Sequence, residues 1–499
     1  VINTYSPMGR HYDGSGVVAA LADDGPVGPH IDYQGRIDQS NTTTNNGNHG
    51  DMTTGILMGG GNLDPTKRGM GTVAFIYIYD IGGYNHILNS PTTNQTLGVM
   101  VTSTSYSQGC NDYTTDTQTG DQILNQNPTL LFVFSAGNNG PGDCGYGAGA
   151  GWGNVTGGYK QGKNVIACGN LNYLDVLEAS SSRGPAEDGR IKPDICSNGA
   201  NQLSTDGPNA YQVGGGTSAA CPGIAGIVTQ LHQAYRELNG GVDAEGALIK
   251  ACMLNTADEL GNPGPDFKHG WGRVNAFRAV TTLEDNRFLS AVSTQGTTNT
   301  HSITVPANTK QLRVMIYWCD VEGDPLAAKA LVNDLNMVVT DPSATSYNPW
   351  ILDPTPNATN LNANAIRGID DLNNVEQVTI DDPAAGIYNI DVNGFLVPQG
   401  PQKYYLVYEF VNEAINVTYP IGAEGFVPGE VETIRWDAFG NTTSFNLEYS
   451  TDLGTTWNSM ATNIPAGQRY YNWTVPNTVT GQALVKVTRG ALSGQSPEA

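Results

Sequence analysis

Charge is scarce in this sequence, and positive charge is the scarcer sign. Charged residues make up 14% of the 499 residues, with 24 Lys+Arg against 47 Asp+Glu and a net charge of −23. An average soluble protein carries about 25% charged residues. We expect no nucleic-acid partner, because binding phosphates requires a basic surface. No apolar run approaches the about 18 residues of a membrane span, so we expect no such span either.

Cysteine is thinly spread, and an initiator Met is absent. The seven cysteines include no Cys-x-x-Cys pair, so the sequence does not predict a cysteine zinc site. The chain begins at Val1 without a basic and apolar signal segment, which is expected of a mature or trimmed product. The acidic, Asn- and Thr-rich composition suits an exported protein. We therefore expect the protein to be secreted (extracellular).

The first part of the chain alternates short apolar runs with stretches of helical periodicity. A parallel sheet buried on both faces requires this pattern, because helices connect and cover its strands. We predict an α/β domain over residues 1–285, with a parallel sheet and helices on both faces. Its predicted strands are Val17–Ala22, Val73–Tyr79, Leu97–Val101, Leu130–Phe134 and Val165–Cys168, and its predicted helices cover 218–238 and 243–254.

From about residue 286 helical periodicity gives way to short strands separated by turn residues. Such a pattern is typical of β-sandwiches. A break near 413–420 divides this region, so we predict a β-sandwich domain over 286–412 and an Ig-like β domain over 413–499. The predicted strands are 312–318, 335–340, 375–380, 388–392 and 404–410 in the first, and 433–436, 445–449, 470–475 and 483–488 in the second.

Ser218 is the first candidate for a catalytic residue. It follows Gly214-Gly215-Gly216-Thr217 and opens the strongest predicted helix. Glycines let a substrate backbone approach closely, and the positive end of a helix favours a nucleophile. A serine in this place is more often a plain N-cap. The motif therefore needs a base and an orienting acid before it indicates catalysis.

A histidine and an aspartate lie earlier in the chain. His49 precedes a stretch of small residues, 53–60, that could form a helix. Asp23 and Asp24 end the first predicted strand, and the carboxyl edge of a parallel sheet is where α/β folds build their sites. Taken separately, these motifs would be a surface loop and an Asp-Asp-Gly turn.

The chain order Asp, His, Ser resembles that of subtilisin-like serine proteases, the subtilases, over about residues 16–280. A fourth segment, Ser135-Ala136-Gly137-Asn138-Asn139-Gly140, is similar to the oxyanion-hole loop of that family. The resemblance implies a secreted serine endopeptidase that hydrolyses extended polypeptides through an acyl-enzyme. We expect a monomer whose propeptide, an inhibitor and folding chaperone, has been removed.

The resemblance assigns a role to each matching residue. Asp23 would orient His49, and His49 would take the proton of Ser218. Asn138 and the Ser218 backbone N–H would donate to the oxyanion. These four residues are the predicted catalytic group.

The same resemblance implies where a substrate binds. Two loops that form opposite walls of the first pocket in subtilases carry Cys110 and Cys144, so a Cys110–Cys144 disulfide is implied. The residues that would line the first specificity pockets are Ser105, Tyr106, Ser107 and Gly137.

Asp24 departs from the common subtilisin pattern and resembles the kexin/furin branch instead. In that branch the matching aspartate faces the substrate side chain one residue before the scissile one, where it attracts Lys or Arg. A carboxylate there would gain a charge-assisted hydrogen bond. We expect broad specificity with a modest basic preference at that position.

The C-terminal half carries resemblances of its own. Leu331–Leu335 and Asn373–Glu376 resemble the jelly-roll domain of certain bacterial alkaline subtilases. Those enzymes commonly bind structural calcium, and the possible oxygen ligands here are Asp320, Asp324 and Asp334. Ser450–Trp457 matches a single Asp-box hairpin of sialidases, which is a turn motif rather than a glycosidase site.

Two alternatives stay open beside a broad-specificity protease. One is a convertase-like processing protease that is specific for basic residues. The other is a non-catalytic adhesion or binding protein on a subtilase scaffold, against which the intact Asp23, His49, Ser218 and Asn138 argue. An esterase or sialidase is not predicted, because the sequence lacks a Gly-x-Ser-x-Gly elbow and repeated Asp-boxes.

Overall fold

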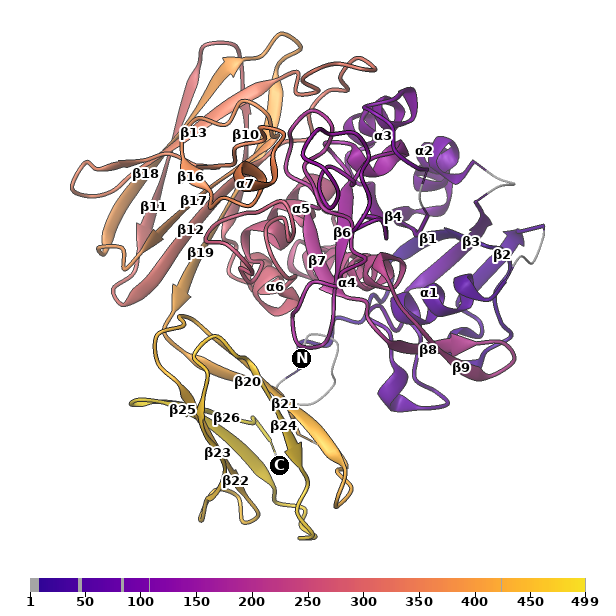
Figure 1. The fold of residues 1–499 in the computed structure, drawn as a ribbon, viewed down its shortest axis with the longest axis vertical. Coiled ribbons are helices and arrows are strands. Elements are labelled where there is room, and N and C mark those ends of the chain that lie inside the picture. Colours follow the sequence, from indigo (N-terminus) through magenta and orange to yellow (C-terminus); the bar gives the residue numbers. More distant parts are fainter. Residues whose placement is uncertain (1–8, 44–46, 82–84, 107, 423, 499) are drawn as a thin grey trace.

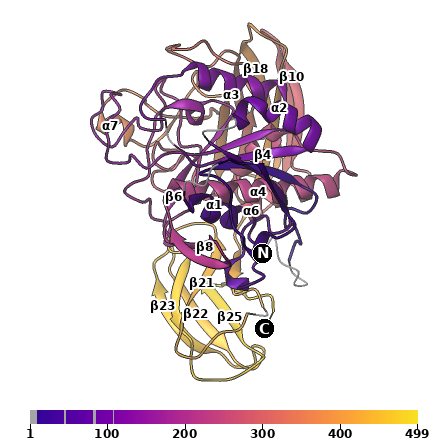
Figure 2. The ribbon, with the colours of Figure 1, turned by 90° about the vertical axis from the view of Figure 1, so that its right-hand side faces the viewer.

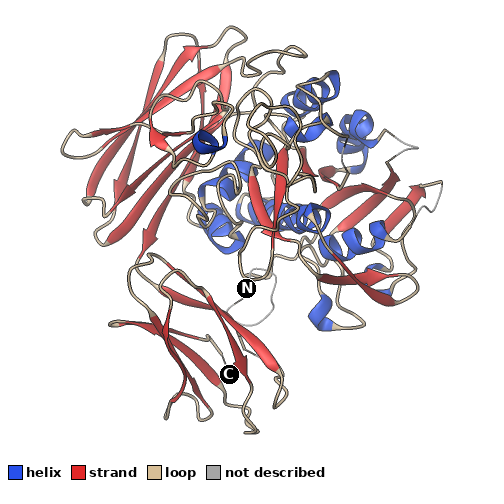
Figure 3. Cartoon of the chain, viewed as in Figure 1, coloured by secondary structure: helices blue, strands red, loops and turns tan. Residues whose placement is uncertain are grey.

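The computed structural model describes residues 9–43, 47–81, 85–106, 108–422 and 424–498 (Figure 1). Three parts follow one another along the chain. The first holds nearly all of the helices, and the other two are built from strands (Figure 3). The last helix of the first part ends at Glu284 and the next strand begins at Phe288, while a second change of sheet falls between Asn412 and Ile415. The domain limits at 285 and 412 remain predictions.

A parallel sheet forms the centre of the first part. Its strand order is β2-β3-β1-β4-β5-β6-β7. The five predicted apolar runs overlap β1, β3, β4, β5 and β6 and begin one or two residues before them, while β2 and β7 were not predicted. The two missed strands are short or polar and form the sheet edges, where fewer apolar side chains are needed. The strands are β1 (Val18–Asp23), β2 (Ile37–Asn41), β3 (Phe75–Asp80), β4 (Val99–Thr104), β5 (Leu131–Ser135), β6 (Ile166–Leu171) and β7 (Ile195–Asn198).

Helices cover both faces of this sheet, which confirms the predicted fold class. One face packs against α4 (Thr217–Leu238) and α5 (Gly246–Asn255) through a large apolar cluster. The opposite face packs against α2 (His86–Leu97) and α3 (Thr115–Gln126). The helices α1 (His49–Met58) and α6 (Ala276–Glu284) complete this part, with an antiparallel hairpin of β8 (Gln202–Asp206) and β9 (Ala210–Gly214) beside α1.

The second part consists of two four-stranded antiparallel sheets that enclose an apolar core. Their orders are β10-β19-β12-β17 and β11-β18-β13-β14. The predicted strands lie within β12, β13, β17, β18 and β19. The bounds are β10 (Phe288–Ser293), β11 (Thr298–Val305), β12 (Thr309–Tyr317), β13 (Asp334–Thr340), β14 (Ser346–Tyr347), β17 (Val375–Asp381), β18 (Gly386–Leu396) and β19 (Gln402–Asn412), with β15 (Trp350–Ile351), β16 (Ile366–Arg367) and α7 (Ala358–Leu361) in a long connection.

The third part lies below the other two in Figure 2 and has two antiparallel sheets around Trp436 and Phe445. The Asp-box segment forms the turn between β22 and β23, where Asp452 accepts hydrogen bonds from Ser450 and Thr456. The strands are β20 (Ile415–Tyr419), β21 (Val431–Ala438), β22 (Phe445–Ser450), β23 (Asn458–Ile464), β24 (Tyr470–Thr474), β25 (Leu484–Arg489) and β26 (Leu492–Gln495).

The first and second parts share one buried interface. Met315, Tyr317 and Val407 of the second part belong to the same apolar cluster as α5 and α6. Across this interface Lys163 Nζ lies 2.5 Å from Asp320 Oδ2, and both side chains are fully buried. None of the helices in the described part of the chain combines the length and apolar surface that a membrane crossing requires.

Candidate active site

The predicted site residues gather at the carboxyl edge of the central sheet. The neighbouring strands β1, β4 and β5 are parallel, so their carboxyl ends lie side by side. Asp23 is the last residue of β1, Ser105 directly follows β4, and Asn138 follows β5 after two residues. The chain runs to opposite sides of the sheet from β1 and β4, and α/β proteins place ligands at such a switch point.

A short hydrogen bond joins Asp23 and His49. His49 is the first residue of α1, and its Nδ1 lies 2.6 Å from Asp23 Oδ1. The Asp23 carboxylate is further held by the Thr53 hydroxyl at 2.9 Å and the Asp24 amide at 2.9 Å. The bond to Asp23 raises the pKa of His49 against the lowering effect of burial, and the negative charge of Asp24 adds to the rise. The carboxylate is therefore fixed to stabilise a positive imidazolium.

Thr53 is a site residue that sequence reasoning missed. It stands four residues after His49, one helical turn along α1, and so projects from the same face. That spacing is the signal that could have identified it once α1 was known to begin at His49.

Ser218 lies in the first turn of α4, where backbone N–H groups have no partner within the helix. Its carbonyl accepts a hydrogen bond from Ser105 Oγ at 3.0 Å, which ties the end of β4 to this turn. Ser218 is largely buried, with 8% of the residue exposed. Within the described residues no hydrogen bond joins the His49 ring to the Ser218 hydroxyl. Catalytic hydrogen bonds in a free enzyme often tighten only when substrate is bound.

Asn138 is exposed and oriented by the same turn. Its Oδ1 accepts hydrogen bonds from Thr217 N at 2.9 Å and Thr217 Oγ1 at 3.0 Å. Because the oxygen is held in this way, the Nδ2 amide remains as the donor beside Ser218. Gly216 has φ +92°, and a Cβ there would lie 3.0 Å from Asn138 Nδ2. Glycine is therefore needed for both its conformation and this close approach.

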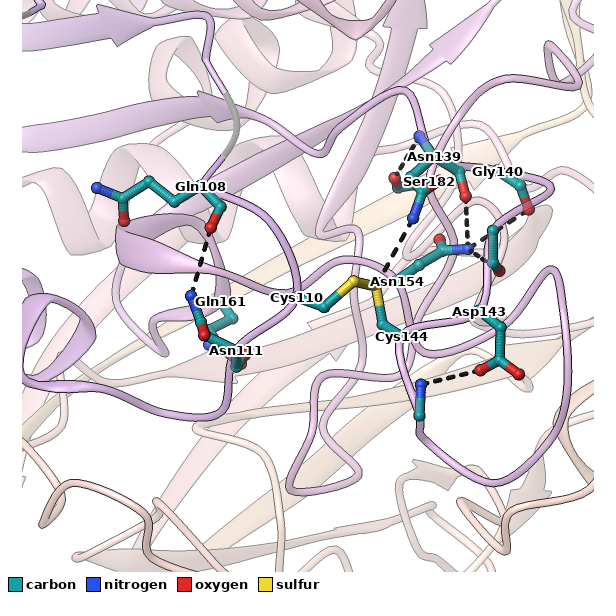
Figure 4. Close-up of a disulfide and its surroundings, with 12 residues drawn as sticks. Gln108, Cys110, Asn111, Asn139, Gly140, Asp143, Cys144, Asn154, Gln161 and Ser182 are labelled. Carbon is teal, nitrogen blue, oxygen red and sulfur yellow. Dashed lines mark hydrogen bonds between the residues drawn. A yellow bond between two sulfur atoms is a disulfide. The ribbon is translucent and has the colours of Figure 1, made fainter.

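The two loops after β4 and β5 are joined by a disulfide between Cys110 and Cys144 (Figure 4). Asn154 Nδ2 donates to the carbonyls of Asn139 and Gly142 and so holds the second loop closed. The remaining five cysteines are free, and four of them are buried.

The predicted substrate residues lie on these loops. Tyr106 is half-buried, and its ring meets Phe134 edge to face at 6.3 Å between centroids. Gly137 has φ +114° and donates its amide to Thr217 Oγ1 at 3.2 Å. Ser107 lies outside the described residues.

Asp24 has a role that the sequence analysis did not predict. Its Oδ2 accepts the amide of His49 at 3.0 Å, and its Oδ1 accepts the amide of Gly50 at 2.8 Å. Asp24 therefore caps the N-terminus of α1 and complements the positive end of its dipole. Both carboxylate oxygens already have partners, which leaves less capacity to attract a basic side chain.

The three predicted calcium ligands do not come together as one metal site. Asp320 is bound to Lys163 and to the amides of Val332 and Asn333, and Asp324 is exposed. Asp334 lies 3.7 Å from Lys329 Nζ. Across the ranges that the structure describes, no group of three or more His, Cys, Asp or Glu side chains could hold a metal ion. The buried ammonium of Lys163, rather than a metal ion, neutralises Asp320.

A family match and several relatives cover the first part of the chain. The profile of the subtilase family matches residues 14–272 of the 499. The serine protease AprX of Bacillus subtilis is 28% identical over 320 residues, which cover 54% of this chain and 68% of AprX. The membrane-bound transcription factor site-1 protease of Mus musculus is 31% identical over 139 residues, 26% of this chain and 12% of that protein.

Other relatives are more distant or much longer. The serine protease/ABC transporter B family protein tagA of Dictyostelium discoideum is 24% identical over 268 residues, 46% of this chain but only 15% of tagA. The chain thus matches a small fraction of several relatives' own length. The solved protease domain of PatA has 18% identity and a TM-score of 0.42, covering 54% of this chain and 96% of that domain. On the match to residues 14–272, the chain belongs to the subtilase family, a family of serine proteases.

Proposed function

We propose that the protein is a serine endopeptidase that hydrolyses peptide bonds of extended polypeptides, with Asp23, His49 and Ser218 as its catalytic triad. The observation that carries the proposal is the 2.6 Å bond from His49 Nδ1 to a buried Asp23 at the sheet edge where Ser218 and Asn138 also lie. A carboxylate in that place selects the tautomer that carries its proton on Nδ1. The Nε2 atom is then free to accept a proton.

The acylation step follows from these positions. His49 Nε2 takes the proton of Ser218 Oγ while the oxygen attacks the scissile carbonyl carbon, and the carbonyl electron pair moves onto oxygen. Asn138 Nδ2 and the Ser218 amide donate hydrogen bonds to this oxyanion, which carries its full charge only in and after the transition state. The imidazolium gives its proton to the leaving amine as the C–N bond breaks, and an ester on Ser218 remains.

Deacylation repeats the chemistry with water. His49 removes a proton from the water that attacks the ester carbonyl, and then returns a proton to Ser218 Oγ as the acid product leaves. Asp23 stays ionised throughout and stabilises the positive imidazole. The hydroxyl of Thr53 holds the second Asp23 oxygen, so the carboxylate cannot rotate away from the ring.

Broad specificity fits the site better than a strict convertase-like preference. Asp24 is the one acid expected to attract a basic side chain. Both of its carboxylate oxygens accept hydrogen bonds from backbone amides in the first turn of α1. We infer that the enzyme is secreted, as its composition suggests, and that it acts as a monomer. Structural calcium is general among subtilases, and its ligands in this chain would be residues other than the trio of Asp320, Asp324 and Asp334.

A serine-directed reagent tests the proposal. A fluorophosphonate should label the wild-type protein on Ser218 alone, and Ser218→Ala should remove both the label and the hydrolysis of casein. Ser346→Ala, which removes an exposed hydroxyl in β14, is the matched control and should keep both. Labelling without any hydrolysis would contradict an endopeptidase and favour a binding protein on the same scaffold.

A further inference from the structure

Lys160 is a buried cation that lies beside the two loops of the proposed substrate site. It lies in the short helix η3 (Gly158–Gln161) and is only 4% exposed. Its ammonium group approaches the loop after β5, because a Cβ on Gly137 would lie 3.0 Å from Lys160 Nζ. Gly137 directly precedes Asn138.

The segment around Lys160 is fixed to the other loop, which follows β4, and to α3. Gln161 Nε2 donates to the carbonyl of Asn111 at 2.9 Å, and Thr117 Oγ1 donates to the carbonyl of Gly158 at 2.8 Å. A Cβ on Gly157 would meet the Gly109 carbonyl oxygen at 2.1 Å, so the two backbones are in contact. Figure 4 shows Gln108, Asn111 and Gln161 on one side of the disulfide, with Asn139 and Ser182 on the other.

Both loops also contact the first turn of α4. Ser105 donates to the Ser218 carbonyl, and the Gly137 amide donates to Thr217 Oγ1. Ser135 Oγ donates to the Tyr106 carbonyl at 3.3 Å, which joins the loops to each other. Lys160 therefore lies between the two segments that flank the nucleophile, with its ammonium near Gly137 and its neighbours Gly157 and Gln161 against the loop after β4.

The direction of the substrate follows from the oxyanion. If the scissile carbonyl oxygen is bound by Asn138, the Cα of the same substrate residue is one bond from the attacked carbon. Its side chain must then lie within a few ångströms of the residues that flank Asn138, and these include Gly137. Because Gly137 has no side chain, the Lys160 ammonium lies close to the position expected for the substrate side chain.

We infer that Lys160 selects an acidic side chain, Asp or Glu, at the substrate residue that supplies the scissile carbonyl. This inference rests on the proposed endopeptidase function and names its preferred substrates. A carboxylate that enters a poorly hydrated pocket needs a positive partner, and a charge-assisted hydrogen bond from an ammonium provides one. Burial lowers the pKa of Lys160 to about 8, so the ammonium still carries its charge at neutral pH.

Peptides that differ only at that residue test the inference. With Glu, Gln, Leu or Lys in an otherwise constant sequence, wild-type kcat/KM at pH 7 should be about ten- to a hundredfold higher for Glu than for Gln, and lowest for Lys. This comparison uses only the wild-type enzyme, so it tests the acidic preference even if a Lys160 variant does not fold. Equal rates for Glu and Gln, or a preference for Lys or Leu, would overturn the inference.

Variants of Lys160 then test whether this residue causes the preference for Glu. In Lys160→Met the ratio of Glu to Gln should fall to about one, while Lys160→Arg should keep a ratio well above one. Lys403→Met removes an exposed lysine of β19 and should leave the ratio unchanged. A Glu preference that survives in Lys160→Met would assign selectivity to another residue and overturn the proposal. If wild type cleaves none of the peptides and takes no serine label, the proposed function itself has failed.

Discussion

The sheet edge that holds Ser218 and the interface between the first and second parts use polar groups in opposite ways. At the edge, His49 is partly exposed and Asn138 is exposed, and both keep donor or acceptor atoms for the proposed substrate. At the interface, Lys163 and Asp320 are fully buried, and each is bonded to the other and to backbone groups. The edge retains unused hydrogen-bonding capacity, whereas the Lys163–Asp320 pair is fully bonded within the protein.

This difference separates what should affect catalysis from what should affect stability. Removing a polar group at the edge deletes a contact that forms fully only in the transition state, so the rate falls while the fold persists. Removing one member of the interface pair leaves a buried charge without its partner, so the fold is destabilised. Variants at the two places should therefore differ in which of the two properties they lose.

The largest effect is expected for Ser218→Ala. The substitution removes a single oxygen and leaves the backbone of α4 unchanged, so the melting temperature should stay within about 2 °C of wild type. The value of kcat should fall by roughly a million-fold, which is the size known for the triad serine of subtilisin itself. Calorimetry and a fluorogenic peptide assay measure the two quantities. A large stability loss would mean that the edge and the interface do not differ as described.

Asp320→Asn should be the most damaging change at the interface. It removes the negative charge beside Lys163 Nζ inside the protein, and breaking such a buried pair costs about 3–5 kcal/mol of unfolding free energy. Glu245→Gln is the matched control, because Glu245 and Lys403 also pair across the two parts but are partly exposed. That pair should contribute about 0–1 kcal/mol. Urea unfolding of both variants checks the difference, and equal losses would refute it.

Asn138→Leu removes the side-chain donor to the oxyanion. We expect kcat to fall by about 100- to 1,000-fold, or roughly 3–4 kcal/mol, with little change in KM. That magnitude is known for the oxyanion-hole asparagine of subtilisin. Steady-state kinetics on one peptide separate the two constants. A change confined to KM would show that Asn138 binds ground state and transition state equally.

The pH profile should respond to both carboxylates near His49. In the proposed mechanism the neutral imidazole is the base, so kcat/KM should rise with pH through the pKa of His49. That pKa lies above its usual value of about 6.5 because of Asp23 and Asp24. Asp24→Asn removes one negative charge, so the rise should move to lower pH. The variant should otherwise retain cleavage, because an amide oxygen can still cap α1. An unshifted profile would show that Asp24 does not act on His49 through its charge.

The smallest effect is expected for substrate preference at the position before the scissile residue. Since both Asp24 oxygens bind backbone amides, the ratio of kcat/KM for Lys and Ala at that position should change by less than about threefold in Asp24→Ser. The assay uses two peptides and both enzymes. A tenfold change would restore the kexin-like role that the sequence suggested.

Much of the fold could be predicted from local patterns. The strands at the centre of the first sheet are continuous apolar runs because both faces are covered by helices, whereas the edge strand β2 reads Ile-Asp-Gln-Ser-Asn and carries no such signal. The long helix begins at Thr217, one residue before the predicted start, with Gly216 as its N-cap. In the two β parts, the strands with strong alternation were predicted and the more polar ones, such as β11 and β23, were not.

The family could be read from the sequence alone, because short motifs with fixed neighbours carry that information. The same motifs name the residues of the proposed triad. The partners of the remaining charged groups depend on the three-dimensional fold. Asp24 and Asp320 are both aspartates in plausible ligand positions, yet one caps α1 and the other pairs with a lysine 157 residues away. A carboxylate binds whichever donors the fold brings within about 3 Å, and no local pattern specifies donors that distant in the chain.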